Sequence, residues 1–381
     1  METWDVIVAG AGQAGCAAAW DLAAGGARVL LLHGGPDRAK PCAGGLTIKA
    51  LRRYRFAIDE VIRERVERMR LGHDGRGTVE VSAASTFCVM THRRELDDLC
   101  RRRARERGAV WRVDGVRSLR QDTDGATLTM AGGDTLRARW LIAADGAHSP
   151  IRRLLQGQSP VPGAMALEAH VPRDAARSYP LMTLDFQTVP GGYGWLFPKG
   201  DHINVGLYVH HRDRARLTRD RLADYARRAL GSDALEQVGG YPLGTWLTRR
   251  PPRCGRVLFA GDAARAADCM TGEGIAQALE TGELAARIAA ASGPAAAGDA
   301  AAAYRAAIRR GMAIDDWLSS RFSAVLAAER GMRGWFRLAN ASAGSRRRFV
   351  HWMFEDYPRA GLITPWRWHR GFLHPPGPYP G

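Results

Sequence analysis

Three glycines near the start of the chain constrain its fold more than any other feature. Gly10, Gly12 and Gly15 form a G-x-G-x-x-G pattern directly after the short apolar stretch 6–9. That stretch is typical of a buried parallel strand, and the small residues from Cys16 onward are typical of a helix. In such a unit the first glycine makes a tight turn, the second admits a pyrophosphate to the backbone, and the third allows close helix packing. The sequence therefore predicts a dinucleotide site at a helix start, the alternative being a glycine-rich turn without function.

The second strand, 28–32, is followed by His33. An acidic residue ordinarily contacts the ribose at this position, so the ribose contact is not predicted in detail. The phosphate argument is unaffected, because it depends on backbone N–H groups.

Two later segments identify the dinucleotide by resemblance. One apolar stretch, 140–146, ends in Asp145 and a glycine, and a second, 256–262, ends in Gly261 and Asp262. With the glycine pattern they resemble the flavoprotein hydroxylase and reductase superfamily, in which FAD lies extended across the domain. The resemblance implies that Asp262 hydrogen-bonds the ribityl and pyrophosphate region, and that Asp145 helps to hold the shape of the flavin-binding fold.

An arginine in the segment 91–97 also matches this superfamily. Arg93 corresponds to an arginine at a helix start that contacts FAD, with Arg94 as the alternative register. The other interpretation of Arg93 is a solvated helix charge.

Three further stretches narrow the resemblance to the geranylgeranyl reductase family of FAD proteins, which reduce isolated C=C bonds of isoprenoid chains. The stretches are 40–46, 193–199 and 271–275, and they occur in the family's order and spacing. Within them the resemblance implies that the cofactor-binding residues are Lys40, Gly44, Gly45, Gly272, Glu273, Gly274 and Ile275. Two departures from the family pattern are Ala43 in place of a glycine and Cys269 in place of a proline, both expected near the reactive edge of the flavin.

The stretch 193–199 and the loop before it supply the candidate catalytic residues. Tyr193, Trp195 and Phe197 alternate on a strand, so they point to one face and form an aromatic wall for an isoprenoid chain. Simple core packing of that face is the alternative. Lys199 is expected to meet a phosphate or carboxylate headgroup, or to be an ordinary turn lysine. Cys42 is expected beside the isoalloxazine as a proton donor or a shaping residue, or as a small buried residue.

Composition favours a cytoplasmic protein. The six cysteines have neither paired C-x-x-C spacing nor metal-ligand spacing, so the sequence predicts reduced thiols and no metal. No signal peptide is expected, because a strand begins almost at once, and no apolar run is long enough to cross a membrane.

The formal net charge of +16 requires an explanation. A solvated arginine-rich surface is one, and nucleic acid is disfavoured because no recognised binding motif accompanies the charge. The segments 346–354 and 366–373 combine arginines with aromatic residues, which predicts peripheral contact with an anionic membrane. The alternative is a C-terminal helix that packs its aromatic residues on the core.

These observations predict an α/β protein in three parts. A Rossmann-type FAD-binding domain comprises residues 1–155 and 251–310, an antiparallel-sheet substrate domain 156–250, and a helical C-terminal part 311–381. The pattern also predicts helices over 57–69 and 212–230.

The predicted function is reduction of C=C bonds in an isoprenoid or other apolar substrate by hydride transfer from reduced flavin. NAD(P)H or a ferredoxin would supply the electrons. Two alternatives remain open. The first is an FAD-dependent monooxygenase or halogenase, since 193–198 partly matches the tryptophan-halogenase pattern. The second is a non-catalytic basic membrane-binding protein.

Overall fold

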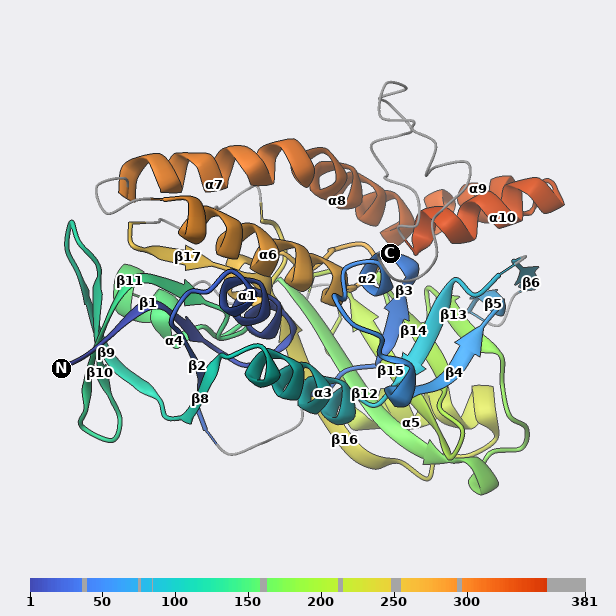
Figure 1. The fold of residues 1–381 in the computed structure, drawn as a ribbon. Coiled ribbons are helices and arrows are strands. Elements are labelled where there is room, and N and C mark those ends of the chain that lie inside the picture. Colours follow the sequence, from blue (N-terminus) through green and yellow to red (C-terminus); the bar gives the residue numbers. More distant parts are fainter. Residues whose placement is uncertain are drawn as a thin grey trace.

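The fold was analysed in a computed structural model, which describes residues 1–35, 40–74, 77–83, 85–157, 163–211, 215–247, 255–292 and 297–354. Two large sheets lie side by side, and a row of C-terminal helices runs along both (Figure 1). This is the mixed α/β architecture with a helical C-terminal part that the sequence predicts.

The first sheet is the Rossmann-type sheet. Its central strand β1 (Glu2–Ala9) pairs in parallel with β2 (Val29–His33) on one side and β11 (Thr135–Ala143) on the other. β8 (Val110–Val113) and β17 (Val257–Phe259) extend it in parallel, and β9 (Val116–Gln121) and β10 (Ala126–Met130) extend it in antiparallel fashion. The carboxyl ends of β1, β11 and β17 therefore meet at one edge.

Helices α1 (Gln13–Ala24) and α6 (Ile275–Ala291) pack against each other beside this sheet. Gly282 of α6 allows the contact, because a Cβ there would lie 2.2 Å from the Ala14 carbonyl oxygen. Helix α3 (Arg93–Glu106) packs on α1 as well. The start of α1 and the start of α6 are thereby fixed next to each other.

The second sheet has the strand order β16–β12–β15–β14–β13–β5–β6. The bounds are β5 (Arg68–His73), β6 (Thr78–Ser82), β12 (Ala164–Pro172), β13 (Met182–Phe186), β14 (Gly192–Pro198), β15 (His202–Val209) and β16 (Glu236–Leu243). All neighbours are antiparallel except β13 and β5, which are parallel. Because β5 and β6 come from the N-terminal part, this sheet extends beyond the predicted segment 156–250.

Two predicted helices differ in the structure. Over 57–69 the chain forms a short 3-10 helix, η1 (Asp59–Val61), and then β4 (Ile62–Val66) and the start of β5. The predicted helix 212–230 is shorter: α5 spans Arg219–Leu230, begins at an N-cap threonine and ends at a left-handed glycine. β4 joins β3 (Gly45–Thr47) and β7 (Cys88–Thr91) in a small third sheet.

The C-terminal helices are α7 (Ala297–Gly311), α8 (Ala313–Ala327), α9 (Glu329–Asn340) and α10 (Ala343–Met353). They run from α6, over the first sheet, to β6 at the far edge of the second sheet (Figure 1). The short elements are α2 (Ile48–Leu51), α4 (Pro150–Gln156), η2 (Arg173–Ala175) and η3 (Gly261–Ala264). In the part of the chain that the structure describes, no helix combines the length and apolarity needed to cross a bilayer.

Candidate active site

A cavity of about 250 Å³ lies where the loops of the first sheet meet the second sheet. At one end it is lined by the start of α1 and by the loop at η3. The middle is lined by segments 40–45 and 271–275, and the other end by the side chains of β13, β14 and α10. The stretches that the sequence singles out as scattered motifs therefore surround one space.

The three glycines of the fingerprint have different surroundings. Gly10 has a φ of +108°, and a Cβ there would lie 2.2 Å from the Ala144 carbonyl oxygen. A Cβ on Gly15 would lie 1.8 Å from the carbonyl oxygen of Gly10. Gly12 faces open space instead, because the nearest atom to its Cβ position is Arg93 Nη2 at 3.7 Å.

The start of α1 fits a phosphate group. Gly12 is its N-cap and has no side chain to cap the helix, and Gln13 and Ala14 follow it along the cavity wall. Backbone N–H groups at such a helix start bind anions, and open space before Gly12 provides the room. These features fit the pyrophosphate of FAD.

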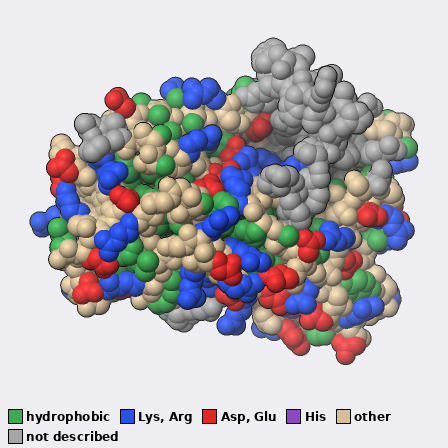
Figure 2. Space-filling model, in the orientation of Figure 1, with side chains coloured by type: hydrophobic (Ala, Val, Ile, Leu, Met, Phe, Trp, Pro, Cys, Tyr) green, Lys and Arg blue, Asp and Glu red, His purple; other side chains and the backbone are tan. Residues whose placement is uncertain are grey.

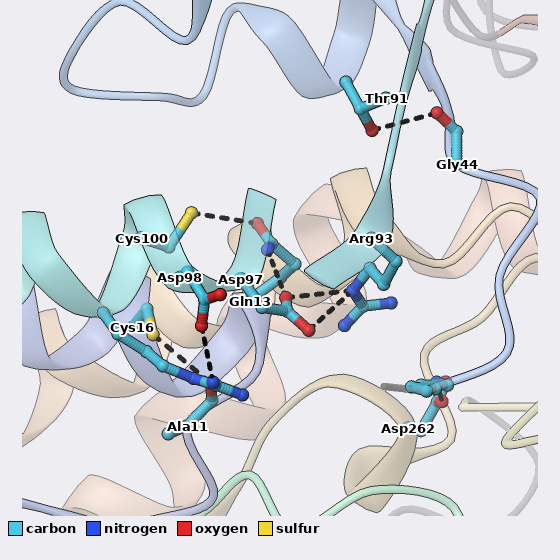
Figure 3. Close-up of polar contacts among 12 residues, drawn as sticks. Ala11, Gln13, Cys16, Gly44, Thr91, Arg93, Asp97, Asp98, Cys100 and Asp262 are labelled. Atoms are coloured by element: carbon cyan, nitrogen blue, oxygen red, sulfur yellow. Dashed lines mark hydrogen bonds and ion pairs between the residues drawn. The ribbon is translucent and has the colours of Figure 1, made fainter. Parts of the chain in front are cut away.

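Arg93 is fixed beside this helix start by a buried polar network (Figure 3). Its Nε donates to both carboxylate oxygens of Asp97 at 2.9 Å, and Gln13 Nε2 donates to Asp97 Oδ1 at 2.6 Å. Tyr54 OH donates to Gln13 Oε1 at 2.7 Å. Burial lowers the pKa of Arg93, but Asp97 and Cys42 together outweigh burial and raise it overall. Arg93 lines the cavity, whereas Arg94 is exposed to solvent.

Lys40 and Asp262 meet across the cavity. Lys40 Nζ lies 2.5 Å from Asp262 Oδ2 and 4.2 Å from the ring centroid of Tyr241 on β16. Burial lowers the pKa of Lys40, but Asp262 and Tyr241 together outweigh burial and raise it overall. Gly261, before Asp262, has a φ of +59°, and a Cβ there would lie 3.1 Å from Ala14 Cβ. A basic and an acidic group thus stand near the phosphate end.

Asp145 lies beside the cavity wall and caps α4. Its Oδ1 accepts from Ser149 Oγ at 2.7 Å and its Oδ2 from the Ile151 N–H at 2.9 Å. Burial raises the pKa of Asp145. Its neighbours Ala144 and Gly146 line the cavity. Asp145 therefore shapes the loop from which those two residues reach the site.

The segment 271–275 begins α6 and lines the cavity. Glu273 Oε1 accepts from the N–H groups of Ile275 at 2.9 Å and Ala276 at 2.8 Å, so this carboxylate caps the helix. Gly272 has a φ of +71°, and a Cβ there would lie 2.9 Å from the Tyr208 ring. Gly274, the N-cap of α6, also lines the cavity.

Cys269 differs from the expectation that it lies at the reactive edge of the flavin. Its side chain is buried, and it is absent from the residues that line the cavity in the described part of the chain. Its carbonyl oxygen accepts from Tyr208 OH and lies 2.9 Å from His210 Nδ1. Cys269 therefore anchors the loop behind the cavity wall.

The loop 40–45 forms the opposite wall, with Cys42, Ala43, Gly44 and Gly45 all at the cavity. Gly44 has a φ of +68°, and its carbonyl oxygen accepts from the Thr91 N–H at 2.8 Å and from Thr91 Oγ1 at 3.1 Å (Figure 3).

Lys199 does not occupy a surface position for a headgroup. It is 3% exposed, and its ammonium donates to the Thr91 carbonyl oxygen at 2.6 Å. A Cβ on Gly44 would lie 2.3 Å from Lys199 Nζ, so the lysine lies directly behind the loop that carries Cys42. Burial lowers the pKa of Lys199.

The aromatic side chains of β14 form one wall, as their alternation predicts. Tyr193, Trp195 and Phe197 all line the cavity. Tyr193 OH donates to the Thr271 carbonyl oxygen, and Trp195 Nε1 donates to Asn204 Oδ1 at 2.7 Å. Hydrogen bonds thus fix the polar atoms of two rings, and the apolar ring faces remain for a ligand.

The last residue of α10 and the residue after it lie at the cavity. Met353 and Phe354 line it, and the Phe354 ring lies 5.2 Å from Phe87. Trp352 is buried against Phe322, with ring centroids 5.0 Å apart. For these three residues the core-packing alternative is correct, and they do not face a membrane. The segment 366–373 lies outside the described residues.

Several site residues carry no motif and were missed by sequence reasoning. Gln13 and Asp97 support Arg93, and Glu168 of β12 lines the cavity with only 7% exposure. The signal in the sequence for Glu168 was its charge, which is unusual inside a mostly apolar strand. Nothing in the sequence indicated that Met353 and Phe354 reach the cavity.

Comparisons with known proteins agree with this geometry. The family described as "FAD binding domain" matches residues 3–310. Menaquinone reductase of Mycobacterium tuberculosis is 30% identical over 325 residues, which cover 75% of this chain and 76% of that protein. Digeranylgeranylglycerophospholipid reductase 1 of Methanopyrus kandleri is 31% identical over 318 residues, which cover 75% of this chain and 80% of that protein.

Solved structures show the same fold. A geranylgeranyl bacteriochlorophyll reductase-like protein from Thermoplasma acidophilum superposes with a TM-score of 0.77 at 22% identity, covering 96% of this chain and 99% of that one. A probable FAD-dependent monooxygenase from Pseudomonas aeruginosa superposes with a TM-score of 0.67 at 19% identity, covering 87% of this chain and 99% of that one. At these identities the likeness concerns the fold alone.

Proposed function

We propose a function from the premise that this chain belongs to the geranylgeranyl reductase family of FAD-dependent oxidoreductases, within the flavoprotein hydroxylase-like superfamily. The proposed reaction is reduction of a C=C bond in an isoprenoid chain or another apolar substrate. The observation that carries the proposal is one continuous cavity, which runs from the glycine fingerprint to a wall of aromatic and aliphatic side chains. A phosphate-binding end and an apolar end thus share one space.

The chain's own residues would divide the work between these ends. Gly12, Arg93 and Asp262 would hold FAD, and a bound reduced flavin supplies the hydride. Tyr193 and Trp195 would hold an apolar chain against it and keep water out. An isolated C=C bond has no charged group for recognition, so its position depends on the shape of such a wall.

The names of the relatives favour an isoprenoid over other apolar molecules. Digeranylgeranyl lipids and menaquinone both carry polyprenyl chains, although their polar parts differ. Substrates that share an apolar part and differ in their polar part are expected for cavities that mainly hold the prenyl chain. We therefore propose polyprenyl compounds as the substrate class.

For the electron donor, we propose NAD(P)H acting without a fingerprint of its own, or a ferredoxin attracted by the basic surface. Both would act on an enzyme in the cytoplasm. The two donors are distinguished by which one bleaches the flavin absorbance under anaerobic conditions.

An oxygen-using flavin enzyme is the second candidate, because a monooxygenase has the same fold. A small aromatic or amino-acid substrate would suit that chemistry, and the apolar length of the cavity would then be unused. A basic membrane-binding protein without catalysis is the third, and a purified protein without flavin would support it.

One anaerobic assay tests these candidates together. The purified protein is reduced with dithionite and mixed with geranylgeranyl diphosphate in the absence of oxygen. We expect the flavin absorbance to return as the product gains two hydrogens, which mass spectrometry detects. Oxygen consumption that depends on substrate, with no reduced polyprenyl product, would contradict the reductase and support the monooxygenase.

A further inference from the structure

One face of the second sheet carries a line of polar side chains from the cavity to the edge of the sheet. In the strand register, Trp195 pairs with Gly206, and Gly206 pairs with Glu168 on β12. The next position along the same face pairs Asn204 with His170. Residues two apart on a strand share a face, so Glu168 and His170 both lie on the face that lines the cavity.

The cavity end of this line is tightly defined. A Cβ on Gly206 would lie 2.0 Å from the Trp195 ring, so this glycine lets the indole lie flat across β15. The indole N–H donates a hydrogen bond to Asn204 Oδ1 at 2.7 Å, and Asn204 is fully buried. Asn204 is thereby fixed diagonally next to Glu168, on the adjacent strand.

Glu168 faces charged and polar groups from four other segments of the chain. Burial is the largest influence on its pKa and raises it. Lys199 after β14, the Cys42 peptide, Asn204 and Arg93 oppose burial without reversing the direction. A buried carboxyl with a raised pKa holds its proton closer to neutral pH than an exposed one does.

The other end of the line reaches solvent at three histidines. The rings of His170 and His202 stack with centroids 4.0 Å apart, and His92 stacks on His202 at 5.1 Å. His202 Nδ1 lies 2.8 Å from the carboxylate of the exposed Asp201. Burial lowers the pKa of His170 to about 4, so its ring is neutral at pH 7.

We propose that Glu168 donates the proton that completes reduction of the C=C bond. This inference rests on the proposed function. The O–H bond of Glu168 breaks as a C–H bond forms on the carbon that does not receive the hydride. The hydride brings the electron pair, and the carboxylate left on Glu168 regains a proton from water after the product has left the cavity.

This assignment differs from a thiol donor at Cys42. Both side chains belong to the cavity wall, and the Cys42 peptide contacts Glu168. The two residues can be separated by substitution.

The first test detects the protonated carboxyl group of Glu168. Infrared spectra of flavin-loaded wild type, Glu168→Gln and Glu80→Gln are compared at pH 7. Glu80 is an exposed carboxylate on β6 of the same sheet, paired with Arg70, and serves as the matched control. We expect a protonated-carboxyl C=O band in wild type and Glu80→Gln that is missing from Glu168→Gln. Identical spectra in wild type and Glu168→Gln would overturn the proposal.

The second test reads the chemistry in a single anaerobic turnover with geranylgeranyl diphosphate. Glu168→Gln should bind flavin and be reduced by dithionite normally, yet reduce the C=C bond on the order of 100-fold more slowly or worse. Glu80→Gln should match wild type. A Glu168→Gln rate within about threefold of wild type, or a loss of turnover in Cys42→Ala alone, would overturn the assignment. Wild-type protein that reduces no polyprenyl substrate overturns the proposed function, and this inference with it.

Discussion

At the scale of single residues, the three fingerprint glycines are not equivalent. Gly10 and Gly15 are required by the fold, since any side chain there would overlap a carbonyl group of the chain itself. Gly12 is different, because a side chain there would project into the cavity and meet only Arg93 Nη2 at 3.7 Å. A substitution at Gly12 therefore separates loss of the cofactor from loss of the fold.

We expect Gly12→Val to fold and to purify without bound flavin. A branched side chain there would hold a pyrophosphate away from the helix N–H groups, and each lost hydrogen bond to a charged group costs about 1.5–3 kcal/mol, or roughly tenfold or more in affinity. Flavin absorbance after purification and circular dichroism measure the two properties. Gly298→Val on α7 is the control, because no atom lies within 4 Å of its Cβ position. Stoichiometric flavin in Gly12→Val would contradict this placement of the phosphates.

The residues that could be predicted are those whose role is set by nearby sequence. The glycines follow a strand and open a helix, so local pattern was sufficient to single them out, whereas Asp262 was singled out by the family resemblance. Glu168 and Asp97 act through neighbours that are remote in the chain, such as Asn204 and Gln13. Their isolated positions in the sequence carry no record of those neighbours, and only the folded arrangement brings them together.

At the scale of elements, α9 contains two glycines in opposite situations. Gly331 lies against the end of α8, and a Cβ there would be 2.2 Å from the Val325 carbonyl oxygen. Gly334 is exposed on the same helix, with no atom within 4 Å of its Cβ position. The first glycine permits the tight α8–α9 turn, and the second only lowers helix propensity.

These glycines predict opposite effects of the same substitution. Gly334→Ala should raise the free energy of unfolding by about 0.5–1 kcal/mol, because alanine favours the helix. Gly331→Ala should lower it by about 1–3 kcal/mol, because the backbone must shift to relieve the overlap. Denaturant unfolding of the two variants measures both changes. A stabilised Gly331→Ala protein would show that the α8–α9 turn differs from the one described.

The misassigned elements have a common physical cause. In the segment 57–69, arginines and glutamates separate the apolar residues at intervals that suit a helix face as well as an edge strand. Pairing of β4 with β7, and of β5 with β13, decides for strands. Both partner strands are distant in sequence, so the periodicity of the segment alone could not distinguish a helix from a strand.

At the scale of the whole molecule, the positive charge is spread out. Figure 2 shows Lys and Arg side chains distributed among Asp and Glu over the face in view. The C-terminal helices expose two large apolar side chains on their outer side. Trp317 of α8 is 51% exposed and Leu338 of α9 is 63% exposed. The guanidinium of Arg321 lies 5.6 Å from the Trp317 ring centroid, and Arg337 is exposed beside Leu338. We propose this outer side of α8 and α9 as the peripheral contact with an anionic membrane.

Vesicle sedimentation tests the contact. The protein should bind anionic vesicles at low salt and detach at high salt, because each cation near the surface contributes about 1 kcal/mol that salt screens. Trp317→Ser with Leu338→Ser should weaken binding roughly 100-fold or more, because each side chain loses about 1.5–3 kcal/mol of apolar burial. Val113→Ser with Leu154→Ser, at exposed apolar residues elsewhere, should bind as wild type does. Equal binding by both double variants would locate the contact elsewhere.

The position of Met353 and Phe354 in the cavity wall has a consequence for evolution of the substrate range. These side chains occupy part of the space that an apolar molecule would fill, and they lie at the end of α10 and directly after it, far in sequence from every cofactor motif. The depth of the cavity can therefore change by mutation of α10 while the redox machinery is left intact. Related proteins with larger or smaller side chains at these two positions would then accept apolar substrates of different lengths with the same catalytic centre.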